Sequence, residues 1–89
     1  MVKILKKLHE NDVSLKIDKV HGDKDILICL EKFVSLNTYR QQIFIDIEML
    51  DKAKDPVGYI TDFLDNTIDN FLINIMKIEN VKPTYITIS

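Results

Sequence analysis

Residues 55–78 read DPVGYITDFLDNTIDNFLINIMKI, and this stretch carries more apolar surface than any other part of the chain. Asp55 suits the cap position before a helix, and Pro56 suits the first helical position, where its missing N–H costs nothing. Apolar side chains then recur at steps of three and four, at Val57, Ile60, Leu64, Ile68, Phe71, Ile75 and Ile78. The spacing predicts one long amphipathic helix over 56–78, whose apolar side the rest of the chain must cover.

The chain before this helix has the patterns of a second helix and a sheet. Residues 1–10 place apolar and charged side chains on opposite sides, which predicts a short helix. Residues 13–49 contain three stretches typical of strands, with turn residues between them. The middle stretch, 25–33, is apolar at successive positions, so we expect it at the centre of the sheet. The third stretch, 39–49, alternates between apolar and mixed residues throughout.

Together these elements predict a single α+β domain over residues 1–89, with the long helix packed on an antiparallel three-stranded meander. The tail leaves two alternatives open. Pro83 is expected to end any helix, and residues 84–88 have the β-branched and aromatic content of a strand. We favour a short fourth strand at an edge of the sheet over a loose terminus.

Charge and composition restrict the classes of function. The chain has 89 residues and a net charge of −2, so a generally basic nucleic-acid surface is absent. Residues 46–69 hold seven acidic residues and two lysines, which predicts an acidic surface. The single cysteine, Cys29, cannot form an intramolecular disulfide, and no apolar run reaches the length of a membrane span. We therefore expect a protein of the cytoplasm.

The sequence predicts no catalytic, metal or cofactor site. Asp62, Asp65 and Asp69 share one side of the long helix, where three carboxylates could hold Mg²⁺ or Ca²⁺. Helical spacing leaves these carboxylates in a row, whereas a cation needs them to converge, so a solvated or partner-binding surface is the better interpretation. Cys29 has no histidine close to it in the sequence that could act as its base. The protein is thus predicted not to be an enzyme.

The acidic residues instead predict a surface that binds a partner protein. Asp46 and Glu48 are two residues apart in the expected third strand and would point to the same face. With the three aspartates of the long helix, they form a set of expected contact charges for a basic partner surface. The set is Asp46, Glu48, Asp62, Asp65 and Asp69.

The long helix also predicts a homodimer. A helix over 56–78 spans about 35 Å, whereas three strands make a sheet only about 15 Å wide. Five apolar side chains of this helix cannot all be covered inside one protomer, and symmetric pairing would bury the surplus. These side chains are Tyr59, Phe63, Phe71, Ile73 and Met76. The edge of the first strand, or residues 84–88, offers an alternative route to a dimer by strand addition.

Two other classes of function remain open. A dimeric nucleic-acid-binding module would use the lysines near the N-terminus to contact phosphates. These lysines are Lys3, Lys6, Lys7, Lys16 and Lys19. A structural or assembly subunit would instead use the surplus apolar surface of the long helix.

The order of a short helix, three strands and an acidic C-terminal helix resembles that of small accessory proteins encoded by phages and prophages. Anti-CRISPR inhibitors with an acidic surface that imitates nucleic acid are among these proteins. The resemblance spans Val2 to Ile78, rests on architecture and composition, and assigns a role to no residue. It implies a phage or mobile-element accessory factor that binds and modulates a host protein, in the cytoplasm of the host cell.

Overall fold

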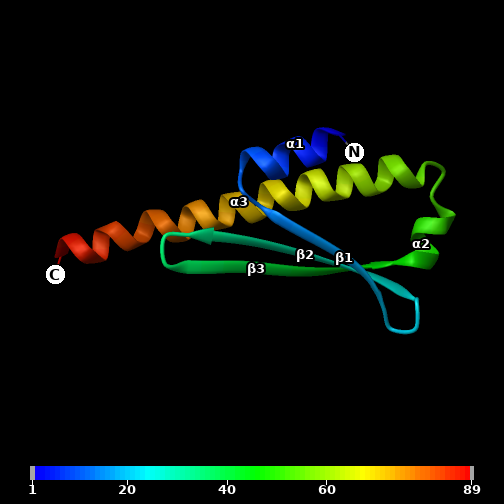
Figure 1. The fold of residues 1–89 in the computed structure, drawn as a ribbon, viewed down its shortest axis with the longest axis horizontal. Helices are drawn as coiled ribbons and strands as arrows, with labels where there is room; N and C mark the ends of the chain where they lie inside the picture. Colours follow the sequence, from blue (N-terminus) through cyan, green and yellow to red (C-terminus); the bar gives the residue numbers. More distant parts are fainter. Residues whose placement is uncertain (1, 89) are drawn as a thin grey trace.

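The computed structural model describes the backbone from residue 2 to residue 88 and the side chains up to residue 80. Its elements are, in chain order, α1 (Val2–Glu10), β1 (Ser14–Val20), β2 (Asp25–Val34), β3 (Asn37–Asp46), α2 (Ile47–Lys52) and α3 (Pro56–Ile88). A short first helix, an antiparallel three-stranded sheet and a long last helix confirm the predicted α+β fold (Figure 1).

The sheet is a meander with the strand order β1-β2-β3, and both neighbouring pairs are antiparallel. The apolar strand β2 is therefore central, as its sequence predicts. The turn between β1 and β2 has three successive residues with positive φ, His21 at 57°, Gly22 at 65° and Asp23 at 64°. Glycine adopts this conformation without a steric cost, and aspartate tolerates it better than most residues do.

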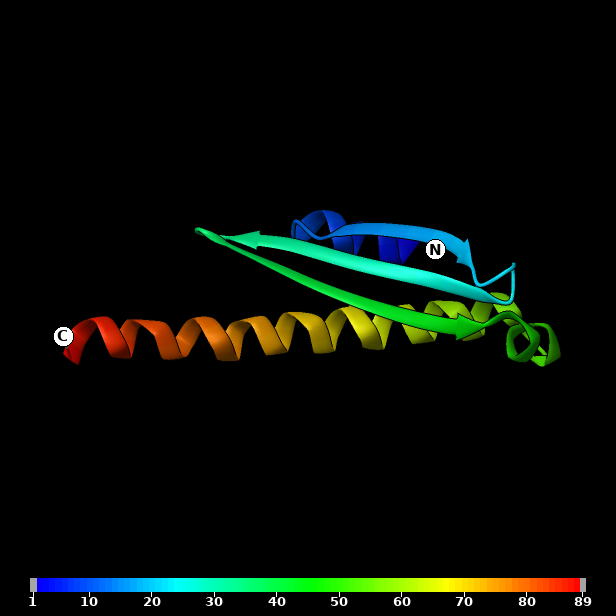
Figure 2. The ribbon, with the colours of Figure 1, turned by 90° about the horizontal axis from the view of Figure 1, so that it is seen from below.

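Helices α1 and α3 lie on the same face of the sheet, which we call the inner face (Figures 1 and 2). Alternate strand residues point to this face and meet the apolar sides of both helices. The buried core consists of Ile4, Leu8, Val13, Ile28, Leu30, Ile45, Leu64, Ile68, Phe71 and Ile75. Full burial of one such side chain contributes about 1.5–3 kcal/mol, so this cluster is the main source of stability.

Strand β3 ends at Asp46, so the prediction of a strand that continues to Met49 is wrong. The Oδ1 atom of Asp46 accepts a hydrogen bond of 2.9 Å from the backbone N–H of Glu48, and α2 starts at Ile47. An aspartate that caps a helix in this way satisfies one of the free N–H groups of the first turn. This local bond outweighs the alternating pattern of residues 47–49.

Helix α3 extends to Ile88, so it does not end at Ile78 and residues 84–88 do not form an edge strand. Both predictions are wrong. The last turns of α3 project past the turn between β2 and β3 (Figures 1 and 2). A segment in that position has no strand edge beside it, and it can bond its own backbone groups by continuing the helix.

The apolar side chains assigned to a dimer interface have different environments. Tyr59, Ile73 and Met76 are exposed, with Met76 at 62%. Phe71 is only 4% exposed and belongs to the core, and Phe63 packs against that core. One protomer thus covers Phe71 and Phe63 and leaves the other three exposed, which agrees with the expectation that not all five can be covered inside one protomer. Pairing through the three exposed residues stays a prediction, whereas Phe71 is not available for it.

Candidate functional site

Acidic side chains gather at one end of the sheet, where the turn between β1 and β2 meets the start of α2. A shallow hollow at this point is lined by Asp23, Lys24, Asp25, Asp46, Ile47, Glu48 and Asp51. We call its five acidic residues the acidic end. Two of them, Asp46 and Glu48, are predicted contact residues, and the fold adds the other three.

Backbone contacts fix the geometry of this end. The N–H of Ile47 donates a hydrogen bond of 3.0 Å to the carbonyl oxygen of Lys24, which joins the start of α2 to the turn. Because the strand stops at Asp46, Asp46 and Glu48 do not share a strand face as predicted. Asp46 caps α2, whereas Glu48 lies in the first turn of α2, where the positive end of the helix dipole favours a carboxylate.

Two of the carboxylates belong to residues directly opposite each other on neighbouring strands. Asp25 in β2 is the direct partner of Asp46 in β3, and like charges in such a position are destabilising. His21 Nδ1 lies 2.7 Å from Asp25 Oδ2, and the His21 ring packs against Phe44 with 5.2 Å between ring centroids. Protonated His21 would therefore offset part of the repulsion between the two aspartates.

The aspartates of α3 form a separate group. Lys7 in α1 donates hydrogen bonds to Asp65 and, at 2.8 Å, to Asp69. The contact to Asp65 lowers the pKa of the Asp65 carboxyl, and both aspartates raise the pKa of the Lys7 ammonium. Asp65 and Asp69 thus pair within the protein, whereas the neighbouring Asp62 is exposed. The structure does not join these three residues and the acidic end in one hollow.

Sequence reasoning missed three members of the acidic end, Asp23, Asp25 and Asp51. Asp23 and Asp25 are two residues apart, whereas Asp51 is far from both in the sequence, and each is unremarkable by itself. An antiparallel pair does place the start of β2 beside the end of β3, so the register could have identified Asp25 opposite Asp46. Asp51 joins the group because α2 places it one helical turn after Ile47, which lines the same hollow. The predicted strand to Met49 did not allow this.

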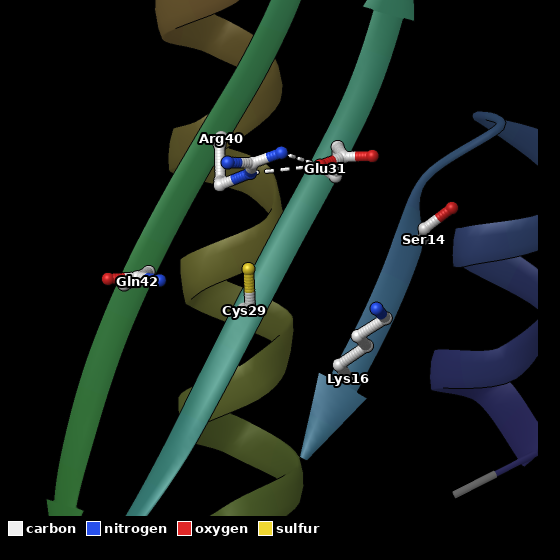
Figure 3. Close-up of a pocket in the computed structure, with 6 residues that line it drawn as sticks. All are labelled: Ser14, Lys16, Cys29, Glu31, Arg40 and Gln42. Carbon is white, nitrogen blue, oxygen red and sulfur yellow. Dashed lines mark hydrogen bonds and ion pairs between the residues drawn. The ribbon is translucent and has the colours of Figure 1, made fainter. Parts of the chain in front are cut away.

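The outer face of the sheet carries a shallow polar pocket lined by Ser14, Lys16, Cys29, Glu31, Arg40 and Gln42 (Figure 3). Arg40 donates two hydrogen bonds to Glu31 Oε2, at 2.6 and 2.9 Å, and this contact raises the pKa of the guanidinium. The Cys29 thiol lies in the same pocket, but neither His9 nor His21 lines it. The pocket therefore lacks the histidine that would activate a cysteine nucleophile.

The lysines of the nucleic-acid alternative do not form one surface with free charges. Lys7 is bonded to α3, and Lys6 lies 3.9 Å from Glu10. Lys16 lines the outer-face pocket, whereas Lys3 and Lys6 belong to α1 on the other side of the sheet. The predicted basic set is thus divided between two elements and partly neutralised.

Within the side chains that the structure describes, no three or more His, Cys, Asp or Glu residues are placed to hold a metal ion together. In the same part of the chain, no helix has both the length and the apolar character needed to cross a membrane. The chain matches no protein-family model, no curated protein and no solved structure. A functional assignment therefore has to rest on the surface of this chain itself.

Proposed function

We propose that this chain is a non-catalytic binding protein whose acidic end contacts a basic surface on another protein. The observation that carries the proposal is the convergence of Asp23, Asp25, Asp46, Glu48 and Asp51 around one hollow that includes a single lysine. Such a concentration of one sign of charge steers association toward a partner of the opposite charge. The proposed partner is a host protein, and the chain is an accessory factor of a phage or mobile element.

The acidic end is suited to this role because its backbone is held in place. The cap at Asp46 fixes the start of α2, and the bond between Ile47 and Lys24 joins α2 to the turn between β1 and β2. Charged groups on ordered elements lose less conformational entropy on binding than groups on a loose segment. Asp65 and Asp69 contribute less to the proposed surface because Lys7 pairs with both. Asp62 remains a contact residue of the proposal.

Affinity capture with a matched pair of double variants tests this function. The first variant, Glu48→Gln with Asp51→Asn, removes two charges from the acidic end without changing the cap at Asp46. The control, Glu10→Gln with Asp12→Asn, removes two exposed charges outside that hollow. A protein retained from host lysate by the wild type and the control, and lost with the first variant, supports the proposal.

The captured protein is then measured at several salt concentrations. Binding through the acidic end requires an association rate that falls as salt rises, because salt screens steering between charged surfaces. Retention of nothing by the wild type, or equal retention by both double variants, refutes the role of the acidic end. A third variant, Asp62→Asn, measures the contribution of the predicted contact on α3.

A further inference from the structure

The two edges of the sheet differ in accessibility. Strand β3 forms one edge of the sheet. Helix α3 borders this edge, and the two elements together line a shallow groove. The groove residues are Tyr39, Arg40, Gln41, Phe71, Asn74, Ile75 and Ile78. Strand β1 forms the other edge, and α1 lies behind it on the inner face rather than beside it (Figure 2). A strand from another chain therefore has better access to β1.

The hydrogen-bonding phase of the sheet shows which backbone groups of β1 face outward. Hydrogen-bonded and non-hydrogen-bonded pairs alternate along an antiparallel ladder. The bond from Ile47 to Lys24 makes that pair a hydrogen-bonded one, so Asp25 is in the non-hydrogen-bonded phase toward β3. The N–H and C=O groups of Asp25 and of every second residue after it consequently point toward β1.

The register then assigns the residues of β1. Residues 14, 16, 18 and 20 of β1 are opposite the β2 residues whose N–H and C=O groups point toward β1. The intervening residues, Leu15, Ile17 and Lys19, direct their N–H and C=O groups away from β2. These groups form an open edge with Ile17 at its centre, and such an edge is a template for pairing with another strand.

Apolar side chains border this open edge. Ile17 points to the inner face and is 51% exposed, and Leu5 of α1 is 60% exposed. Lys7 faces α3, and Leu5 is two residues away from Lys7, which places it on the opposite side of the helix. Leu5 therefore lies on the flank of α1 away from α3. Pairing at β1 would cover both apolar side chains.

We propose that β1 pairs with β1 of a second copy of this chain, antiparallel and with the two-fold axis at Ile17. In this register Lys16 of each copy is opposite Asp18 of the other, and both side chains lie on the outer face. A shift by two residues would instead place Lys16 opposite Lys16, or Asp18 opposite Asp18. Opposite charges stabilise a cross-strand pair and like charges destabilise it, so the charges of β1 select this register.

The centred register also pairs Leu15 with Lys19 and uses β1 along its whole length from Ser14 to Val20. Leu15, Ile17 and Lys19 are the residues whose backbone groups face outward, so the new ladder bonds the groups that β2 leaves unused. The paired strands join two sheets into one continuous sheet with α1 of each copy on the same side. None of these residues belongs to the acidic end, so this dimer and the proposed function can fail independently.

Charge exchange tests the dimer in solution by light scattering and sedimentation. The wild type is expected to be dimeric at about 100 μM, a concentration that detects micromolar affinity. Lys16→Asp or Asp18→Lys turns two favourable pairs into two like-charged pairs and should raise the dimer dissociation constant about tenfold or more. The double variant, Lys16→Asp with Asp18→Lys, restores both pairs and should restore the dimer. Lys54→Asp, with the same charge change outside β1, should leave it unaltered.

A backbone variant gives an independent test. Ile17→Pro removes an N–H that points away from β2, so the protomer fold should remain and the dimer should be lost. Circular dichroism verifies that each variant is folded. A wild type that is monomeric at about 100 μM overturns the proposal. So does a dimer that persists in Lys16→Asp and Asp18→Lys, or a double variant that remains monomeric although folded.

Discussion

Lys7 in α1 donates a hydrogen bond to Asp65 in α3, 58 residues further along the chain. Both side chains are less than one-third exposed, at 22% and 27%. Asp69 accepts a second hydrogen bond from the same ammonium group. One lysine thus joins the first helix to the long helix and holds two of the acidic residues that were expected to face a partner.

Replacement of this lysine should lower stability in a pH-dependent way. Because the pKa of Asp65 is lowered, the pair makes its full contribution to stability above about pH 4, the ordinary pKa of an aspartate. That contribution is lost as the pH falls through the lowered pKa. Because the pKa of Lys7 is raised, the pair keeps its contribution to stability up to about pH 10, the ordinary pKa of a lysine. That contribution is lost as the pH rises through the raised pKa. Lys7→Met should therefore lower the Tm by a few degrees at neutral pH and by less in acid.

Thermal unfolding followed by circular dichroism between about pH 3 and pH 9 measures this difference. Lys6→Met is the control, because Lys6 and Glu10 form an exposed pair at 3.9 Å that contributes little. A Tm difference between wild type and Lys7→Met that does not shrink in acid would mean that Lys7 acts through packing rather than charge.

Two substitutions at Asp46 separate its cap from its charge. Asp46→Ala removes the acceptor for the N–H of Glu48 and should cost about 1 kcal/mol. Asp46→Asn keeps an oxygen acceptor and removes the like charge opposite Asp25, so its stability should equal or exceed that of the wild type. Urea unfolding of the three proteins gives the free energies. Equal losses in both variants would show that the charge, rather than the cap, stabilises this junction.

The buried stripe of α3 can be tested with two isoleucines of the same helix. Ile68 is fully buried, and Ile68→Ala should lower the free energy of unfolding by about 2–5 kcal/mol. Ile73 is 47% exposed, and Ile73→Ala should cost less than about 1 kcal/mol in the protomer. Urea unfolding compares the two. Similar losses for both would indicate that Ile73 is also covered, as the predicted dimer through α3 requires.

The sequence predicts well those features that depend on neighbours along the chain. The period of α3 identifies Leu64, Ile68, Phe71 and Ile75, and all four are buried. The same period includes Val57 and Ile78, which are exposed. Helical spacing shows which side of a helix is apolar, but it does not show how far along the helix the sheet extends. The antiparallel meander also follows from local turns and strand patterns.

The candidate site depends instead on contacts between distant residues. The opposition of Asp25 and Asp46 requires the register of β2 and β3. The pairing of Lys7 with Asp65 requires the position of α1 beside α3, and this pairing changes which acidic residues remain for a partner. A capping aspartate looks the same in a sequence as a charged strand residue, so the end of β3 was predicted three residues too late.

The order of the sheet and α3 along the chain has a consequence for protein synthesis. The ribosome completes all three strands before it makes the helix that covers Ile28, Leu30 and Ile45. Until Leu64, Ile68 and Phe71 have emerged, the nascent sheet has no partner for most of its apolar face. The native structure can therefore form only after α3 has emerged, and a nascent chain arrested before α3 would be a substrate for chaperones and proteases.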